Sequence, residues 1–220
     1  MSSSKTSNFG NPHIGLFAKA SEKLVAADIS ASPKFLLALE SLGVPVEKVT
    51  ISNSGLVGVY AAMNSNGVVL PPSADPKEFA VFKKYGLNVA KVPARFCAVG
   101  NNIAANDFGA VCNPEMGPIE LKKVSDCLGV EAVAMRVAGY ATTGACVAAT
   151  NKGFAAHNRT PAEELKELQS VLKVPGENCT VNTGVAFVSL GAVANSHGAL
   201  FGEACTGFEV GRVSGSLGLI

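Results

Sequence analysis

Residues Gly58–Val92 read GVYAAMNSNGVVLPPSADPKEFAVFKKYGLNVAKV, and this stretch carries the signals of one strand–turn–strand–helix–strand unit. Asn64-Ser-Asn-Gly67 combines residues that tolerate positive φ and predicts a tight connection, or hinge, between two apolar strands. Asp75-Pro-Lys-Glu78 is a capping box with proline at the first helical position. Gly86 marks the end of that helix, and Leu87–Val92 predicts the closing strand.

The same signals recur along the whole chain with a nearly constant step. One proline series has intervals of 43, 42 and 43 residues, and the hinge glycines have intervals of 42, 44 and 45 residues. Two further glycine series keep the same step. The four series are Pro33, Pro76, Pro118 and Pro161; Gly67, Gly109, Gly153 and Gly198; Gly15, Gly58, Gly100 and Gly144; and Gly43, Gly86 and Gly129. In a chain of 220 residues, a repeat of about 44 residues predicts five units.

The helix starts follow one pattern with small variations. Thr160-Pro-Ala-Glu163 repeats the capping box, and Ser32-Pro33 is a third capping residue followed by proline. In the first unit the hinge falls at Ser21-Glu-Lys23, without glycine. In the fifth unit Gly207 stands in place of the proline and Ser189 in place of the upstream glycine.

A unit with one short helix cannot bury its apolar face alone, so neighbouring units must pack side by side. An open solenoid and a closed ring both satisfy this requirement. A solenoid needs polar terminal caps, whereas the chain ends on Leu217-Gly-Leu-Ile220 and its first unit opens on the strand-like Ile14–Ala18. These ends favour closure into a ring of five blades.

We therefore expect an α/β fold, a five-bladed β/α propeller with pseudo-fivefold symmetry. The expected organisation is a polar N-terminal tail over residues 1–8 and a single domain over residues 9–220, with repeats at about 9–51, 52–93, 94–137, 138–181 and 182–220.

Composition and charge exclude several functional classes. With 18 Lys and Arg against 17 Asp and Glu, and no basic run, the chain lacks the charge of a DNA-binding protein. The polar start does not resemble a signal peptide, and no window approaches the roughly 18 apolar residues that cross a bilayer. We expect a cytoplasmic protein with no membrane partner.

Residues that could support catalysis or bind a metal are scarce. The six cysteines lie at least 15 residues apart without a Cys-x-x-Cys motif, which argues against zinc and indicates reduced core thiols. His157 and His197 are expected at turns or strand ends, and His13 at the surface. Cys205 precedes a helix start, where backbone amides could lower its pKa, so it is either a nucleophile or a small buried residue. We expect no metal and no cofactor.

Uncharged polar residues gather where one unit passes into the next. These segments are Ser52-Asn53-Ser54, Asn101-Asn102, Tyr140-Ala-Thr-Thr143 and Asn182-Thr183. Each is either an ordinary loop or part of a docking surface. In a closed ring they would lie on one face, and neutral amides lose their water at lower cost than charges do.

Several of these segments together resemble the translation initiation factor 6 family of ribosome anti-association factors, over residues 9–220. The resembling segments are Asn64–Pro72, Val99-Gly-Asn101 with Ala105-Asn-Asp107, Thr150-Asn-Lys-Gly153, Thr180-Val-Asn182 and Ala194–Leu200. The lack of an acidic or serine-rich extension after Ile220 resembles the archaeal branch.

This resemblance implies the pentein fold, a ring of five pseudo-symmetric units. It also implies binding to the intersubunit face of the large ribosomal subunit, through its fourteenth protein and the region beside the sarcin–ricin loop. The small subunit is then blocked sterically, and the factor assists late maturation of the large subunit. The implied protein is a monomer that catalyses no reaction.

The resemblance also suggests where the contact surface lies. Asn101 matches the family's Gly-Asn at the start of the third unit, and Asn182 matches a Thr-Val-Asn-Arg-Gly segment in which Thr183 replaces the arginine. The full set of residues expected to bind the large subunit is Asn53, Asn101, Asn102, Tyr140, Asn182 and Thr183. The alternative is a guanidino-modifying pentein enzyme that uses Cys205, which would need a histidine and two carboxylates around a central channel.

Overall fold

The computed structural model describes residues 2–220, and the second unit shows how each repeat folds. Strand β5 (Ala62–Met63) pairs antiparallel with β6 (Gly67–Leu70), and β6 pairs parallel with β7 (Asn88–Lys91). The 3-10 turn η2 (Pro76–Glu78) and helix α3 (Phe79–Lys84) connect β6 to β7. This is the predicted order of strand, turn, strand, helix and strand.

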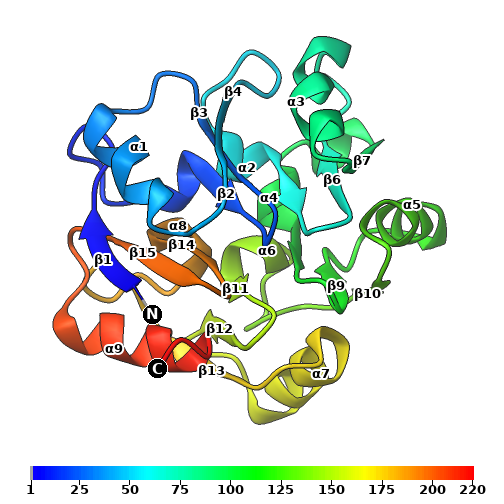
Figure 1. Ribbon diagram of the computed structural model, residues 1–220. Coiled ribbons are helices and arrows are strands. Elements are labelled where there is room, and N and C mark those ends of the chain that lie inside the picture. Colours follow the sequence, from blue (N-terminus) through cyan, green and yellow to red (C-terminus); the bar gives the residue numbers. More distant parts are fainter. Residues whose placement is uncertain (1) are drawn as a thin grey trace.

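Four other three-stranded sheets repeat the pattern around the ring (Figure 1). The first has β2 (Ala18–Ala20), β3 (Val25–Asp28), α1 (Pro33–Glu40) and β4 (Val46–Val49); the third has β8 (Ile103–Ala105), β9 (Gly109–Cys112), α5 (Pro118–Leu128) and β10 (Glu131–Ala134). The fourth has β11 (Val147–Ala149), β12 (Phe154–His157), α7 (Ala162–Leu172) and β13 (Gly176–Cys179); the fifth has β14 (Ala192–Asn195), β15 (Gly198–Gly202) and α9 (Gly207–Ser216). The expected five-unit α/β pentein architecture is confirmed.

The third strand of the fifth sheet comes from the opposite end of the chain. Strand β1 (Ser2–Thr6) pairs parallel with β15, with Thr6 opposite Gly202 (Figure 1, blue against orange). Lys5 Nζ also donates a hydrogen bond of 3.0 Å to the carbonyl oxygen of Cys205. The expectation of a polar tail over residues 1–8 is therefore wrong. A polar sequence can form this edge strand because backbone hydrogen bonds attach it to its partner, and these bonds need no apolar pattern.

Short helical turns line the inside of the ring and explain the upstream glycine series. They are η1 (Ile14–Leu16), α2 (Val57–Tyr60), α4 (Val99–Asn102), α6 (Thr143–Cys146) and α8 (Val188–Gly191). A Cβ atom added at Gly58 would collide with the carbonyl oxygen of Gly15, and one at Gly15 with that of Ser189. The second contact joins the fifth unit to the first. The ring is therefore closed, as the chain ends predicted.

The hinge residues hold neighbouring units together. Asn64 accepts hydrogen bonds from the backbone amides of Asn66 and Gly67, as a turn residue should. Its Nδ2 donates to the carbonyl oxygens of Asn106 (3.0 Å) and Leu128 (2.8 Å) in the third unit. Each such clamp fixes the hinge and the helix end of the next unit.

Three other units use the same clamp. Asn106 donates to the carbonyl oxygens of Thr150 and Leu172, and Asn195 donates to those of Ser21 and Leu42. In the fourth unit, the Thr150 hydroxyl donates to the carbonyl oxygen of Leu217.

The apolar core is divided among the boundaries between units. In one cluster, Leu24, which immediately precedes β3, packs with Ile51 of the first unit and with Phe82 of α3 in the second. Another cluster joins Val69 of β6 to Ile103 of β8. These clusters confirm that each unit buries its apolar face against a neighbour.

The helix starts agree with the sequence pattern in two of three places. Asp75 and Glu78 form the predicted capping box, and the Ser32 hydroxyl accepts the backbone amide of Phe35. The box predicted at Thr160 is wrong. The Thr160 hydroxyl donates to the carbonyl oxygen of His157 instead, and Pro161 is the N-cap of α7.

Candidate functional site

The strand directions give the ring two distinct ends. The loops that join successive units lie at one end with the starts of the long helices, and we call this end the junction face. Its loops are residues 9–10, 52–53, 94–96, 138–139 and 182–184. The hinges and the helix ends lie at the other end, the hinge face, where Asn64, Asn106 and Asn195 form their clamps.

In addition to the turn at Phe9 and Gly10, whose φ angles are 49° and 80°, three junction loops are tight turns with consecutive residues in left-handed backbone conformations. Ser52 and Asn53 have φ of 56° and 58°, and Asn182 and Thr183 have φ of 48° and 61°. The third turn has Ala138 at 52° and Gly139 at 82°. Non-glycine residues adopt this conformation at a cost, so the surrounding structure must hold them in place.

Carboxylates at the starts of the long helices hold these turns. Glu209 accepts hydrogen bonds from the backbone amides of Thr183 (3.1 Å) and Gly184 (2.8 Å). Glu78 does the same for Ser52 (2.8 Å) and Asn53 (3.1 Å).

The charge of Glu209 is stabilised where it lies. Burial would raise the pKa of this carboxyl, but the backbone amides of Thr206, Gly184 and Thr183 hold its pKa below the ordinary value of 4.5. The third turn is held in the same manner, because Glu164 accepts the backbone amide of Ala138 at 2.6 Å. The junction turns are thus rigid and present fixed surfaces.

The structure separates the expected contact residues into three groups. Asn53, Tyr140 and Thr183 are exposed on the junction face. Asn102 and Asn182 are only 7% and 5% exposed, and their side chains bond internally.

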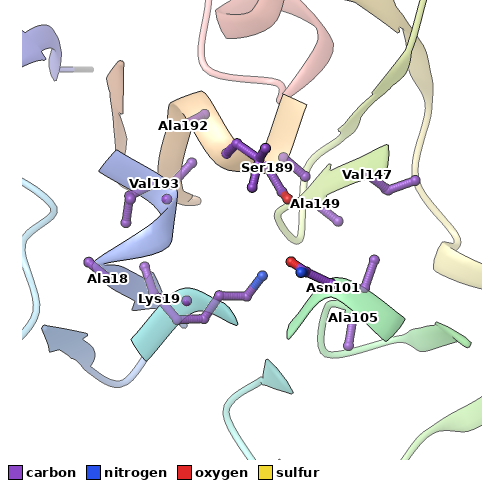
Figure 2. A pocket seen from close by; sticks show the side chains of 16 residues that line it. Ala18, Lys19, Asn101, Ala105, Val147, Ala149, Ser189, Ala192 and Val193 are labelled. Carbon is purple, nitrogen blue, oxygen red and sulfur yellow. The ribbon is translucent and has the colours of Figure 1, made fainter. Parts of the chain in front are cut away.

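Those internal bonds show what the two buried amides do. Asn102 Nδ2 donates to the carbonyl oxygen of Ala98, and Asn182 Nδ2 donates to that of Pro12. Asn101 belongs to α4 and projects into the central channel (Figure 2). The expectation that all four polar segments lie on one face therefore fails for Asn101 and Asn102, and the side chain of Asn182, although it belongs to a junction turn, is not exposed there.

Exposed apolar side chains gather at the junction face, and sequence reasoning missed all of them except Tyr140. Among the described residues, six of the nine exposed large apolar side chains lie at this end of the ring: Phe9, Ile29, Leu56, Ile119, Tyr140 and Phe208. Phe208 and Ile119 follow helix starts but lie outside the apolar stripes of those helices. That departure from periodicity is the signal that could have identified them.

An aromatic cluster forms part of this face between the fourth and fifth units. Tyr140, His157 and Phe187 have ring centroids 5.1 to 5.4 Å apart. His157 ends β12, as predicted for a strand-end residue, and burial followed by the charge of Arg159 lowers its pKa. A groove of about 340 Å³ lies over the cluster and is bordered by Arg159 and Val185.

The thiol of Cys205 lacks the partners of a nucleophile. Cys205 is 2% exposed, and burial raises its pKa. Its sulfur accepts the backbone amide of Asn182 at 3.1 Å, and the imidazole of His13 lies 3.4 Å from the side-chain amide of Asn182. Where the enzyme alternative needs an imidazole and two carboxylates, the central channel is lined by Lys19, Asn101, Ser189 and apolar residues.

Within residues 2–220, no three His, Cys, Asp or Glu side chains are placed so that they could share a metal ion. None of the helices in this part of the chain is long and apolar enough to cross a bilayer.

Comparison with known proteins gives a consistent result over the whole ring. The model of the eIF-6 family matches residues 3–216. A protein of Aeropyrum pernix named translation initiation factor 6 is 44% identical over 220 residues, which cover 97% of this chain and 94% of that protein. Proteins of the same name from Staphylothermus marinus and Methanosphaerula palustris are 34% and 33% identical, and each alignment covers at least 94% of both chains.

Proposed function

This chain belongs to the eIF-6 family, and from that premise we propose that it is a translation factor that binds the large ribosomal subunit and keeps the small subunit from joining. The contact is made on the intersubunit side, at the fourteenth large-subunit protein and the neighbouring sarcin–ricin region. The factor acts as a cytoplasmic monomer, assists maturation of the large subunit and catalyses no reaction.

One observation carries this proposal: the junction face combines exposed apolar side chains with rigid, uncharged turns. Tyr140 and Phe208 are partly or largely exposed there, at 41% and 76%. Aromatic side chains that lose their water on binding contribute most of the affinity in typical interfaces. Asn53 and Thr183 add neutral hydrogen-bonding groups on backbone that is already ordered, so little conformational entropy is lost on docking.

The structure supports steric exclusion of the small subunit better than it supports catalysis. The channel at the centre of the ring contains no imidazole, thiol or carboxylate among its lining residues. A rigid ring seated on the intersubunit side of the large subunit excludes the small subunit by its volume alone.

Sedimentation with purified large subunits tests the proposal. Wild-type protein should travel with the large subunit at physiological salt and should reduce the fraction of joined ribosomes. Tyr140→Ala and Phe208→Asp should each weaken binding about tenfold or more, the effect typical of a buried aromatic contact.

A matched control uses the other end of the ring. Phe108 is 41% exposed on the hinge face, so Phe108→Asp changes the same chemistry away from the expected contact. Equal loss of binding in Phe108→Asp and Phe208→Asp would remove the junction face as the contact site. Failure of the wild-type protein to sediment with large subunits would remove the proposal itself.

A further inference from the structure

The central channel contains a positive charge with no counter-charge. The channel runs along the axis of the ring between inner strands that contribute mostly alanine, such as Ala105 and Ala149 (Figure 2). Of the 16 lining residues, only Lys19 of β2 carries a charge. None of its neighbours within the channel can neutralise the ammonium.

The ammonium of Lys19 has no hydrogen-bond or ion-pair partner among the described residues, whose salt bridges all lie elsewhere. The nearest carboxylates along the axis belong to Glu22 and Asp107, at the hinge end. Glu22 accepts hydrogen bonds from Ser196, and Asp107 accepts them from Ser65. Both carboxylates are therefore already engaged at the rim.

A second polar group faces the same space. Figure 2 shows the side chains of Lys19 and Asn101 reaching toward one another across the cavity. The side-chain amide of Asn101 also has no partner among residues 2–220, and the two groups do not bond directly. A bound water or ion that accepts a hydrogen bond from the Lys19 ammonium and another from the Asn101 amide would give both groups a partner.

The size of the cavity limits what that particle can be. The centres of water-sized spheres occupy about 40 Å³ of this space. At roughly 10–15 Å³ for each water, this is room for about three waters, or for one small ion with its remaining hydration. A phosphate ester, a nucleotide or a peptide is too large.

We propose that the channel binds one small monovalent inorganic anion, of the size of chloride, between the Lys19 ammonium and the Asn101 amide. The Lys19 side chain is half-buried in the channel, and a partly desolvated ammonium without a counter-charge carries a cost that an anion offsets more fully than water does. Both groups donate hydrogen bonds, as an anion requires. The inference concerns the folded ring alone and does not depend on ribosome binding.

Thermal unfolding under controlled anion composition tests this site. Ionic strength is held constant while glutamate, which is too large for the cavity, is replaced stepwise by chloride or bromide. Wild-type protein should gain stability along a saturating curve, because a ligand that binds only the folded state stabilises it by mass action. The saturating gain in stability should be absent in Lys19→Met. It should remain in Lys166→Met, which changes an exposed lysine.

A crystal grown in bromide locates the ion directly. The expected result is an anomalous peak between Lys19 Nζ and Asn101 Nδ2 in the wild type and none in Lys19→Met. Asn101→Asp supplies its own negative charge, so it should also lose the halide dependence while remaining folded. An empty channel at saturating bromide, or the same halide curve in wild type and Lys19→Met, would overturn the proposal.

Discussion

The side-chain amide of Asn195 donates a hydrogen bond of 3.0 Å to the carbonyl oxygen of Leu42, which lies 153 positions earlier in the chain. Through this bond the last hinge holds the first helix. A residue that serves a local turn thus also sets the arrangement of the ring.

We predict that Asn195→Ala destabilises the ring by about 2–3 kcal/mol, because two buried carbonyl oxygens lose their donor. Asn106→Ala should cost a similar amount, since Asn106 serves the equivalent carbonyls between the third and fourth units. Urea unfolding measures both. Asn158→Ala, at an exposed position, is the control and should change the free energy of unfolding by less than about 0.5 kcal/mol. Equal effects in all three variants would contradict the clamp.

Deletion of residues 2–6 should destabilise the protein by roughly 3–5 kcal/mol, the net value of a short ladder of backbone hydrogen bonds. The melting temperature should then fall by on the order of 10 °C. The deletion also exposes the edge of β15, so size-exclusion chromatography should show association between molecules. Ser4→Ala keeps the backbone and should behave as wild type, and an unchanged melt in the deletion would show that β1 contributes nothing.

Glu209→Gln should cost about 1–3 kcal/mol, because the carboxylate that accepts the amides of Thr183 and Gly184 becomes a weaker acceptor. The pKa of Glu209 is lower in the folded chain than its ordinary value of 4.5. Its contribution is therefore complete above about pH 4.5 and disappears as the pH falls through the folded-state pKa. Denaturation of wild type and variant from neutral to acidic pH should show two curves that converge at low pH. A constant gap down to the lowest pH would assign the effect to packing instead.

Lys19 should make the stability rise between about pH 8 and pH 10.5 when no small anion is present. Burial lowers the pKa of Lys19 to about 8 from the ordinary 10.5, so the unfolded chain binds more protons in this window and unfolding becomes harder as the pH rises. The other charged groups near the axis are the carboxylates of Glu22 and Asp107. The free energy of unfolding of Lys19→Met, subtracted from that of the wild type at each pH, isolates the effect of Lys19. Added chloride should make this difference independent of pH. A difference that is already independent of pH in glutamate buffer would refute the prediction.

The fold could be predicted because the repeats are visible in local signals. Gly58 and Gly67 recur at a constant step, and the clash of a side chain at Gly58 with Gly15 explains the first of these series physically. Strand β1 could not be predicted, because Ser2–Thr6 carries no apolar alternation and its partner lies almost 200 residues away. Local patterns do not report such a pairing.

The candidate site was predicted less completely than the fold. Asn53 and Asn182 occupy equivalent left-handed turns, yet Asn53 is exposed and Asn182 is buried. Asn182 is the first left-handed residue of its turn and Asn53 the second, and Asn182 also reaches Pro12 of the next unit, a contact that exists only once the ring has closed. Phe208 was missed because a single apolar residue outside a helical stripe does not by itself indicate a binding surface.

The place of β1 in the fifth sheet sets the order in which the protein can mature as it is synthesised. Strand β1 precedes every other strand of the ring in the sequence, and its partner β15 follows all of them, so β1 is synthesised well before residues 198–202. In a nascent chain, or in one truncated before residue 198, strand β1 therefore has no partner strand and the ring stays open. The fifth sheet can therefore be completed, and the ring closed through it, only after β15 has been synthesised.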